Sequence, residues 1–531
     1  MKKNLTVWNL FSVVILAAFA LFIMYPIFLI LYRSVIHGDT GALTLQNFAH
    51  FFAKKFYWGT MVNSLKVTVV STILSAALGL PLAYLMRSVK IKGSSFLNIL
   101  IVISYLSPPF IGAYAWIQML GRQGVITQFL NDTFGLHYGG VYGFAGIVLV
   151  FTLQSFPLVY IYVSGALKNL DNSLNEAAES LGCSRMGRIW KIIVPLVMPT
   201  LLASSMLVFM RVFADFGTPM LIGEGYKTLP VLIYNQFMGE VSGDDGFAAA
   251  ICCIVIGLTI VMFFVQRFLA GRNTYAMTAL KPMAAESLGG LRNILAHLAV
   301  YMVVGLAILP QFVVVYTSFL ATNGGQVFTG GFALQSYDAT LFAKDNDVIW
   351  HTYFLGLCAI AAVLVLGVLI AYLSVRKRNT LNSILDVITM FPFIIPGSVL
   401  GIAFVFAFNK SPIILTGTAL IMIISFAVRR MPYTVRSSTA ILGNISPSIE
   451  EAAISLGASD MTAFRKITVP MMMPGVLSGA IMSWVTIISE LSSSIILYTN
   501  STQTLTVSIY TEVIRGNYGN ASAYATILTV T

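Results

Sequence analysis

Two segments of the chain carry the same polar residues at the same spacing, although most of the sequence is apolar. Glu176–Pro199 reads EAAESLGCSRMGRIWKIIVPLVMP, and Glu451–Pro474 reads EAAISLGASDMTAFRKITVPMMMP. More than half of the aligned positions are identical. In each copy a carboxylate, which can pair with a basic side chain, stands beside two alanines that permit close approach of another backbone. The pattern is typical of a docking surface, and an ordinary amphipathic loop at the membrane surface is the alternative.

Each segment also predicts a short helix with a narrow apolar stripe. Apolar residues follow the i, i+3, i+4, i+7 spacing of one helical face at Leu174, Ala177, Ala178 and Leu181, and again at Ile449, Ala452, Ala453 and Leu456. Asp171 and Ser446 stand at equivalent positions before these helices, where side chains of their type cap helix N-termini.

The same segments contain signals for a second short helix. Gly182 and Gly457 follow the first helices at the position where helices commonly end in a left-handed residue. Ser184 and Ser459 can then cap a second helix, and we expect Pro195 and Pro470 to end it before the next apolar run. Each segment is therefore expected to form a two-helix elbow. We call residues 168–196 the first elbow and residues 442–472 the second elbow.

Three of the ionisable residues within apolar runs, where charge is costly and functional roles are common, are Arg211, Asp215 and Glu490. Arg211 and Asp215 are four positions apart, so a continuous helix would place them on one face, where they can pair. Glu490 occupies the position of Asp215 in the second copy. One hypothesis is that Arg211, Asp215 and Glu490 line a translocation path. The alternative is structural, with Glu490 held by nearby hydroxyls such as those of Ser489 and Ser493.

Three arginines, Arg429, Arg430 and Arg436, precede the second elbow and have no counterparts before the first. Anchoring at the membrane interface is the expected role for such residues. The alternative is an asymmetric contact with a partner protein.

The composition places these elbows in a membrane protein. Of 531 residues, 57% are hydrophobic and 10% are charged, and the mean hydropathy is +0.85. Soluble domains carry about 25% charged residues. The net charge of +11 is typical of basic cytoplasmic loops, so nucleic acid is not an expected partner. The four cysteines show no spacing of a disulfide framework or zinc site, and the sequence leaves metal ligands unidentified.

Apolar runs long enough to span a bilayer, about 20 residues each, occur six times in each half of the chain. In the first half they are 10–32, 62–86, 96–120, 141–167, 197–222 and 247–266. In the second half they are 293–320, 351–374, 384–408, 412–440, 474–498 and a run from about 518 that stops at Thr531, which predicts a last helix that is cut short. A cytoplasmic N-terminus places most Lys and Arg residues, and both elbows, in the cytoplasm.

The repeat extends beyond the elbows. TLPVLIY (228–234) recurs as TLTVSIY (504–510), and Gly79 recurs as Gly367. An even number of spans gives both halves the same orientation, so we expect an all-α polytopic membrane protein. Its two homologous six-helix transmembrane domains would lie in parallel, related by a pseudo-twofold axis along the membrane normal. The predicted parts are a first domain (1–270), a cytoplasmic linker (271–291) and a second domain (292–531).

The elbow pattern resembles the EAA loop of ATP-binding-cassette importer permeases, and both copies match it. The matching residues are Glu176, Ala177, Ala178, Leu181, Gly182 and Pro195, and then Glu451, Ala452, Ala453, Leu456, Gly457 and Pro470. In that family the loop holds the coupling helix that sits in a groove of the ATPase. The resemblance implies two copies of a cytoplasmic ATPase, an extracytoplasmic solute-binding protein, and a location in the bacterial inner membrane.

The fusion of two permease domains resembles the ferric-iron type most closely, with thiamine and phosphonate permeases as alternatives. The chain has no Gly-Lys-Ser/Thr phosphate-binding loop, so it is not expected to be an enzyme or to hold a cofactor. ATP and magnesium would be bound by the ATPase partner. A secondary carrier with two six-span halves is a further alternative, but that class does not predict paired elbows.

Overall fold

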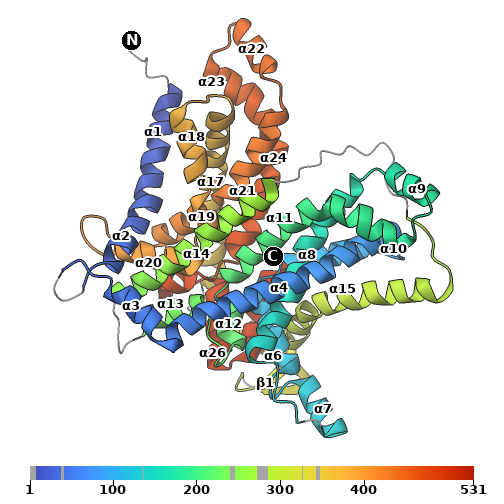
Figure 1. The fold of residues 1–531 in the computed structure, drawn as a ribbon. Coiled ribbons are helices and arrows are strands. Elements are labelled where there is room, and N and C mark those ends of the chain that lie inside the picture. The colour runs from blue at the N-terminus through green and yellow to red at the C-terminus, as the bar shows by residue number, and fades with distance from the viewer. Residues whose placement is uncertain are drawn as a thin grey trace. The chain divides into compact units, whose positions relative to one another are not determined.

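The computed structural model of the chain is almost entirely α-helical (Figure 1). The structure describes residues 7–37, 41–135, 137–239, 245–271, 285–325, 327–342 and 347–531. Most of the predicted linker, residues 272–284, lies outside the described residues. By internal packing the chain divides into two units. Unit 1 comprises Met1–Phe51, Ile233–Ile256 and Leu341–Thr511, and unit 2 comprises Phe52–Leu232, Gly257–Thr340 and Glu512–Thr531.

Unit 1 contains the N-terminal helix and most of the second half of the chain. Its elements are α1 (Val7–Phe19), the π-helical turn η1 (Ala20–Met24), α2 (Tyr25–Ser34), α17 (Val348–Val375), α18 (Thr380–Ile388), α19 (Phe391–Ile394), α20 (Gly397–Phe408), α21 (Ala419–Asn444), α22 (Pro447–Ser455), α23 (Asp460–Ala463), the π-helical turn η3 (Phe464–Thr468), α24 (Val469–Ile488), α25 (Ser494–Leu497) and the 3₁₀ turn η4 (Asn500–Thr502).

Unit 2 contains the middle of the first half together with later segments. Its elements are α4 (Lys55–Ser88), α5 (Ser94–Leu106), α6 (Pro109–Leu120), α7 (Val125–Phe134), α8 (Gly143–Lys168), α9 (Ser173–Ser180), α10 (Arg185–Arg188), the π-helical turn η2 (Ile189–Ile193), α11 (Val194–Phe213), α12 (Gly217–Ile222), α15 (Gly290–Ser318), β1 (Leu320–Asn323), β2 (Val327–Phe332), α16 (Gln335–Leu341) and α27 (Tyr518–Val530). The boundaries between the units fall within α3 (Gln46–Ala53), α13 (Leu229–Met238), α14 (Asp245–Gly271) and α26 (Leu505–Arg515), and at the end of α16, whose last residue, Leu341, belongs to unit 1.

Fewer helices qualify as membrane spans than the predicted six per half. Within the described residues, 8 helices are long and apolar enough to cross a membrane, or up to 10 if each bent pair is one span. The predicted span 412–440 corresponds to α21, which has a suitable length but carries three arginines. The predicted run from 518 corresponds to α27, which has 13 residues. The predicted spans 197–222 and 474–498 are also shorter, because α11 ends at Phe213 and α24 at Ile488.

The predicted spans 96–120 and 384–408 are each broken by a proline. The chain bends by 100° between α5 and α6 and by 110° between α19 and α20. Pro108 and Pro396 occupy these breaks with extended backbone (ψ 135° and 147°). Proline lacks the amide that a continuing helix needs, so each run is divided into two helices.

A long helix pair forms the centre of each unit. In unit 2, α8 packs along α4, and 78% of the apolar window of α8 is buried. Gly79 of α4 lies against Val159 of α8, where a Cβ would stand 2.7 Å from the Val159 Cβ. In unit 1, α17 packs along α21, and Gly367 lies against Thr434 at a similar 2.9 Å. The repeated glycine therefore permits the same close helix crossing in both units.

The first helix of each half packs with helices of the other half. In unit 1, α1 contacts α17 and α18, and α2 contacts α20; the Ser12 hydroxyl donates to Asn382 Oδ1 at 2.6 Å. In unit 2, α15 contacts α5, α6 and α27. The antiparallel hairpin β1–β2 follows α15, with Leu320 opposite Phe332 and Asn323 opposite Val327. Each packing unit therefore contains segments from both sequence repeats. The predicted domain boundaries, which follow the sequence repeat, stay a prediction.

Buried polar side chains connect α6, α15 and α27 within unit 2. The Tyr114 hydroxyl donates to the Tyr518 carbonyl at 2.6 Å and lies 2.8 Å from the Ser522 hydroxyl. The Thr317 hydroxyl donates to Gln118 Oε1 at 3.1 Å and lies 3.0 Å from the same serine. Such side-chain hydrogen bonds between helices stabilise packing in an apolar environment.

Candidate functional site

The elbows have the predicted two-helix form. The first helix is α9 in the first elbow and α22 in the second. Ser446 is the N-cap of α22, as predicted, with Pro447 in the first turn. The predicted cap Asp171 is wrong by one residue, because α9 has Asn172 as its N-cap. The Asp171 carboxylate instead accepts a hydrogen bond from the Ser173 amide at 3.0 Å.

Both glycines end their helices in the left-handed conformation, as predicted, with φ of 78° at Gly182 and 94° at Gly457. The residues after them return hydrogen bonds to the helices: the Cys183 amide donates to Ala178 O at 2.9 Å, and the Ala458 amide donates to Ala453 O at 3.1 Å. This pairing is the Schellman arrangement, which only glycine adopts without strain from a Cβ.

The second helices begin at the predicted serine caps. Ser184 Oγ accepts from the Gly187 amide at 3.2 Å, and Ser459 Oγ accepts from the Thr462 amide at 3.2 Å. The prediction that Pro195 and Pro470 end these helices is wrong. One continuous helix runs from Arg185 to Phe213, and another from Asp460 to Ile488. Each contains a π-helical turn immediately before the proline-containing stretch, at equivalent positions. The wider turn changes the hydrogen-bond register, which lets the proline fit at the start of the next α-helical stretch.

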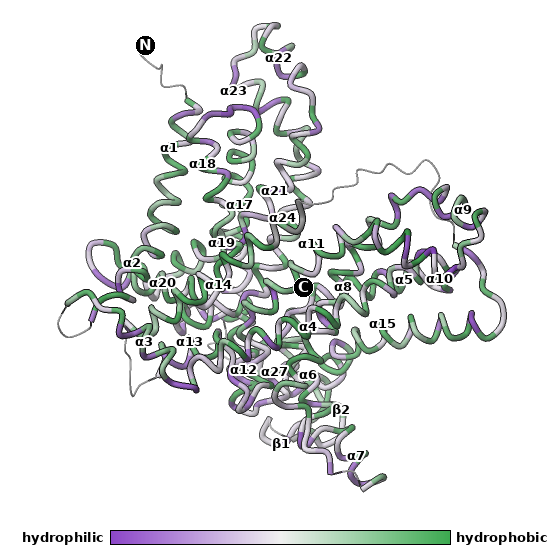
Figure 2. The backbone as a smooth tube through the Cα atoms, in the orientation of Figure 1, coloured by the Kyte–Doolittle hydropathy of each residue, from purple (hydrophilic) through white to green (hydrophobic). Residues whose placement is uncertain are grey.

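The two elbows present the same residues to solvent. Leu181 is 88% exposed and Leu456 is 90% exposed. Ala177 and Ala452 are exposed, as are Glu176 and Glu451, while Ala178 and Ala453 are half-buried. Figure 2 shows hydrophilic residues around α9, α10 and α23, whereas the long helices are mostly hydrophobic. Each elbow thus offers an apolar knob flanked by small residues and a carboxylate, which is a surface suited to a protein partner.

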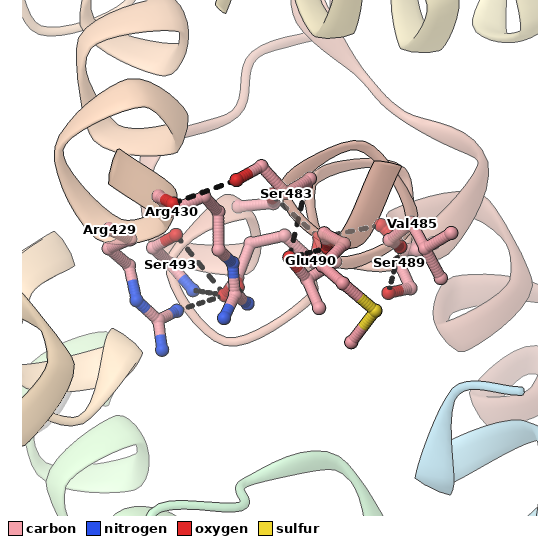
Figure 3. A network of polar contacts seen from close by, with 11 residues as sticks. Arg429, Arg430, Ser483, Val485, Ser489, Glu490 and Ser493 are labelled. Carbon is pink, nitrogen blue, oxygen red and sulfur yellow. Dashed lines mark hydrogen bonds and ion pairs between the residues drawn. The ribbon is translucent and has the colours of Figure 1, made fainter. Parts of the chain in front are cut away.

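Glu490 lies in a buried cluster of ion pairs within unit 1 (Figure 3). Its side chain is 3% exposed and pairs with both Arg429 and Arg430, whose side chains are 11% and 17% exposed. Ser493 donates to Glu490 Oε1 from its amide at 3.1 Å and from its hydroxyl at 3.3 Å. The cluster joins α21 to the segment between α24 and α25. The predicted contact with Ser493 is confirmed, whereas the Ser489 hydroxyl donates to Val485 O at 2.7 Å.

The expectation that Arg429 and Arg430 anchor the chain at the membrane interface is wrong, because both are buried partners of Glu490. Only glycine fits at position 397 beside them, since a Cβ there would stand 2.1 Å from Arg429 Nη1. Arg436 differs. Its side chain is 52% exposed, and it lies 3.4 Å from the Asp386 carboxylate; its interfacial position stays a prediction.

Arg211 and Asp215 each contact other residues of unit 2. The Arg211 guanidinium lies 4.7 Å from the centre of the Tyr105 ring, and Asp215 Oδ1 accepts from the Thr218 amide at 2.9 Å. Since α11 ends at Phe213, Asp215 does not continue the helical face of Arg211, and the spacing argument for their pairing fails.

Asp215 also borders a cavity of about 10 Å³ that Ser64, Thr68 and Thr228 help to line. That volume is close to the smallest that holds one water molecule. The prediction that Arg211, Asp215 and Glu490 line a translocation path stays a prediction. Within the described ranges, no three His, Cys, Asp or Glu side chains are grouped so as to hold a metal ion.

Glu450, the residue before the second EAA motif, is buried in the structure (8% exposed), which its sequence position did not predict. Its contacts are with Tyr372, Arg376 and Thr468. A carboxylate on an otherwise exposed helix gives no sequence signal of burial. The only available hint was its replacement by Asn175 in the first elbow.

Comparison with known proteins agrees with these features. Residues 75–275 and 363–531 each match the family described as "Binding-protein-dependent transport system inner membrane component". The ferric transport system permease protein FbpB of Actinobacillus pleuropneumoniae is 30% identical over 98% of this chain and 76% of its own length. The Fe(3+)-transport system permease protein FbpB 2 of Haemophilus influenzae is 25% identical over 88% of this chain and 86% of its own.

A shorter relative matches part of the chain. The molybdenum transport system permease protein ModB of Escherichia coli strain K12 is 28% identical over 40% of this chain and 93% of its own length. The duplicated family match, together with the apolar helices and the paired elbows, gives the assignment: this chain is a multi-pass protein that belongs to the family of inner-membrane components of binding-protein-dependent transport systems.

Proposed function

We propose that this chain is the membrane-spanning permease of an ATP-driven importer and that its two elbows are the docking sites for two ATPase subunits. The observation that carries this proposal is the matched geometry of the elbows. Each has a left-handed glycine, a serine-capped second helix and a leucine about nine-tenths exposed. A leucine that is exposed at the same position of both elbows is expected to be covered by a partner.

Each docked elbow contributes apolar burial and charge pairing. Burying a fully exposed leucine is favourable by about 1.5–3 kcal/mol, so Leu181 and Leu456 act as anchors in grooves of the ATPase. Glu176 and Glu451 supply carboxylates for basic residues at the rim of each groove. ATP and magnesium are bound by the ATPase subunits, and this chain supplies the contact through which their closure reaches the helices.

The transport cycle follows from the continuity of the helices. Each second elbow helix runs without a break into a long helix, from Arg185 to Phe213 and from Asp460 to Ile488. Movement of a docked elbow therefore moves a membrane-spanning helix as a rigid extension. In this proposal the N-terminus and both elbows are cytoplasmic, and an extracytoplasmic binding protein delivers the solute to the opposite side.

Ferric iron is the proposed solute. The support is similarity over most of the chain to two permeases named for ferric transport. Molybdate, phosphonate and thiamine are the alternatives. Uptake of ⁵⁵Fe by proteoliposomes that contain the permease, its ATPase and its binding protein is expected to require ATP. Uptake of one of the alternatives without iron uptake would reject ferric iron but leave the importer assignment intact.

Docking can be tested on the elbows themselves. Leu181→Asp and Leu456→Asp together are expected to abolish co-purification of the ATPase, since a carboxylate is costly to bury in an apolar groove. Leu43→Asp is a matched control, because Leu43 is 80% exposed in a loop outside the elbows. The docking proposal fails if the double variant retains the ATPase as well as the control does.

A further inference from the structure

The second elbow is attached to its unit by a buried carboxylate. Glu450 lies in the first turn of α22, and the Tyr372 hydroxyl of α17 donates to its Oε1. The Thr468 hydroxyl donates to Glu450 Oε2 at 3.2 Å, and Arg376 Nε stands 3.7 Å from the same oxygen. One carboxylate thus joins the exposed helix of the elbow to the end of α17 and to the π-helical turn η3.

Two basic residues at the end of α17 hold the flanks of the same elbow. Arg376 Nη2 donates to the Ile445 carbonyl, just before α22, at 2.6 Å. Lys377 Nζ lies 3.0 Å from the carboxylate of Asp460, the first residue of α23. The end of α17 therefore contacts both helices of the second elbow as well as the segment that enters it.

An aromatic cluster lies beneath these polar contacts. Trp8 of α1 packs against Tyr372 with ring centroids 4.7 Å apart and against Phe464 of η3 at 5.3 Å. Tyr372 and Phe464 are 4.5 Å apart. Because aromatic packing of this kind is favourable beyond the area buried, the tyrosine that binds Glu450 is itself fixed in place.

In the part of the chain that the structure describes, the first elbow does not have the equivalents of these contacts. At the positions equivalent to Glu450 and Thr468 it has Asn175 and Ile193, and at those equivalent to Arg376 and Lys377 the chain has Ser88 and Val89. The Asn175 Oδ1 atom is buried without a hydrogen-bond partner among the described residues. The ion pair between Arg188 and Glu179, at 2.6 Å, lies within the elbow.

The end of α4 makes a different contact. The Lys90 amide donates to the Glu286 carbonyl at 3.0 Å, and the Glu286 amide donates to the Ser88 carbonyl at 2.9 Å. The end of α4, which corresponds in the sequence repeat to the end of α17, is thus hydrogen-bonded to the segment that precedes α15. The parts of the chain next to the two elbows are therefore held by different contacts.

We propose that Glu450 is a positioning residue that fixes the second elbow to α17, so that the two elbows are mechanically unequal. Movement of the second elbow is transmitted to α17 and α24 together, whereas movement of the first elbow is transmitted through the helix that continues from it, α11. This inference rests on the proposed function of the elbows as ATPase contacts. It assigns the tighter transmission of force to the second elbow.

Hydrogen exchange of the full-length protein in nanodiscs tests the attachment without any ATPase. In Glu450→Gln we expect amides of 447–456 to exchange at least tenfold faster, with amides of 173–181 unchanged. Tyr372→Phe, which keeps the ring and removes the hydroxyl, should give a smaller increase in the same segment. Asn175→Ala is the matched control and should leave both segments unchanged. The proposal would be overturned if exchange of the amides of 447–456 were unchanged in both Glu450→Gln and Tyr372→Phe.

A second measurement tests the consequence for coupling. In proteoliposomes with ATPase and binding protein, Glu450→Gln is expected to raise the ATP hydrolysed per solute transported at least fivefold while ATPase co-purification is retained. Asn175→Ala should keep the wild-type ratio. An unchanged ratio in Glu450→Gln would overturn the assignment of unequal elbows. Loss of the ATPase from wild-type elbows, by contrast, would contradict the proposed function and leave the exchange result intact.

Discussion

Gly79 and Val159 bring α4 and α8 so close that a single added methyl group has no space. A Cβ on Gly79 would lie 2.7 Å from the Cβ and 2.9 Å from Cγ1 of Val159. We therefore expect Gly79→Ala to destabilise the protein by about 1–3 kcal/mol, the usual range for overpacking. Thermal unfolding of the detergent-purified protein measures this effect.

Gly305→Ala is the control for this prediction. Gly305 lies within α15, and a Cβ there meets nothing within 4 Å, so alanine should be neutral or stabilising by up to about 1 kcal/mol. If the two variants unfold at the same temperature, the close crossing of α4 and α8 is incorrect.

Removal of the carboxylate charge at Glu490 should strongly destabilise unit 1. Glu490→Gln leaves Arg429 and Arg430 buried without their counter-charge, and breaking a buried pair in this way costs about 3–5 kcal/mol. Arg436→Gln on the same helix α21 is the control, because its exposed pair with Asp386 is expected to contribute about 0–1 kcal/mol. The midpoint of chemical unfolding should be clearly lower for Glu490→Gln than for Arg436→Gln. Equal stability would show that the buried cluster is not formed.

The left-handed glycines make the elbows sensitive to β-branched residues. Gly182→Val requires a φ near 78° at a residue that disfavours it by about 1–2 kcal/mol, although the space around Gly182 is open. We expect faster hydrogen exchange of 173–181 and weaker ATPase binding. Gly182→Asn should be milder, since asparagine tolerates this conformation. Equal effects of valine and asparagine would indicate that backbone conformation is not the cause.

The Tyr114 hydroxyl should couple α6 energetically to α27. Tyr114→Phe leaves the Tyr518 carbonyl without its donor, and a lost buried hydrogen bond costs about 1–3 kcal/mol. A double-mutant cycle with Ser522→Ala should show non-additive stabilities, because the two hydroxyls are 2.8 Å apart. Tyr32→Phe, at a ring that is 52% exposed, should have little effect. Strict additivity of Tyr114→Phe and Ser522→Ala would contradict the contact.

The elbows could be predicted in detail because their determinants are local. A glycine after a small-residue helix and a serine three residues before a free amide specify turns and caps through neighbouring backbone atoms. The positions of Gly182, Gly457, Ser184 and Ser459 were accordingly correct. The expectation for Pro195 and Pro470 was wrong because a π-helical turn, which has no simple sequence signal, accommodates the proline and keeps the helix continuous.

The buried ion pairs could not be predicted because they depend on contacts distant in sequence. Arg429 lies in α21 and Glu490 in the segment between α24 and α25, and their separation along the chain carries no periodic signal. Asp215 was assigned to the face of Arg211 on the assumption of a helix that in fact ends at Phe213. The bends at Pro108 and Pro396 were not predicted, because the mean hydropathy stays high across a break that changes the direction of the chain but not its polarity.

The first helix of each repeat packs on helices of the other repeat, and this arrangement has a consequence for how the protein is produced. Helix α1 packs on α17 and α18, while α15 packs on α5 and α6. A polypeptide cut in the region 272–284 would give two fragments, each deprived of a helix that its own core requires and each carrying a helix that the other core lacks. Neither fragment should mature alone, and simultaneous synthesis should restore both. Fusion into one chain guarantees equal supply of the two.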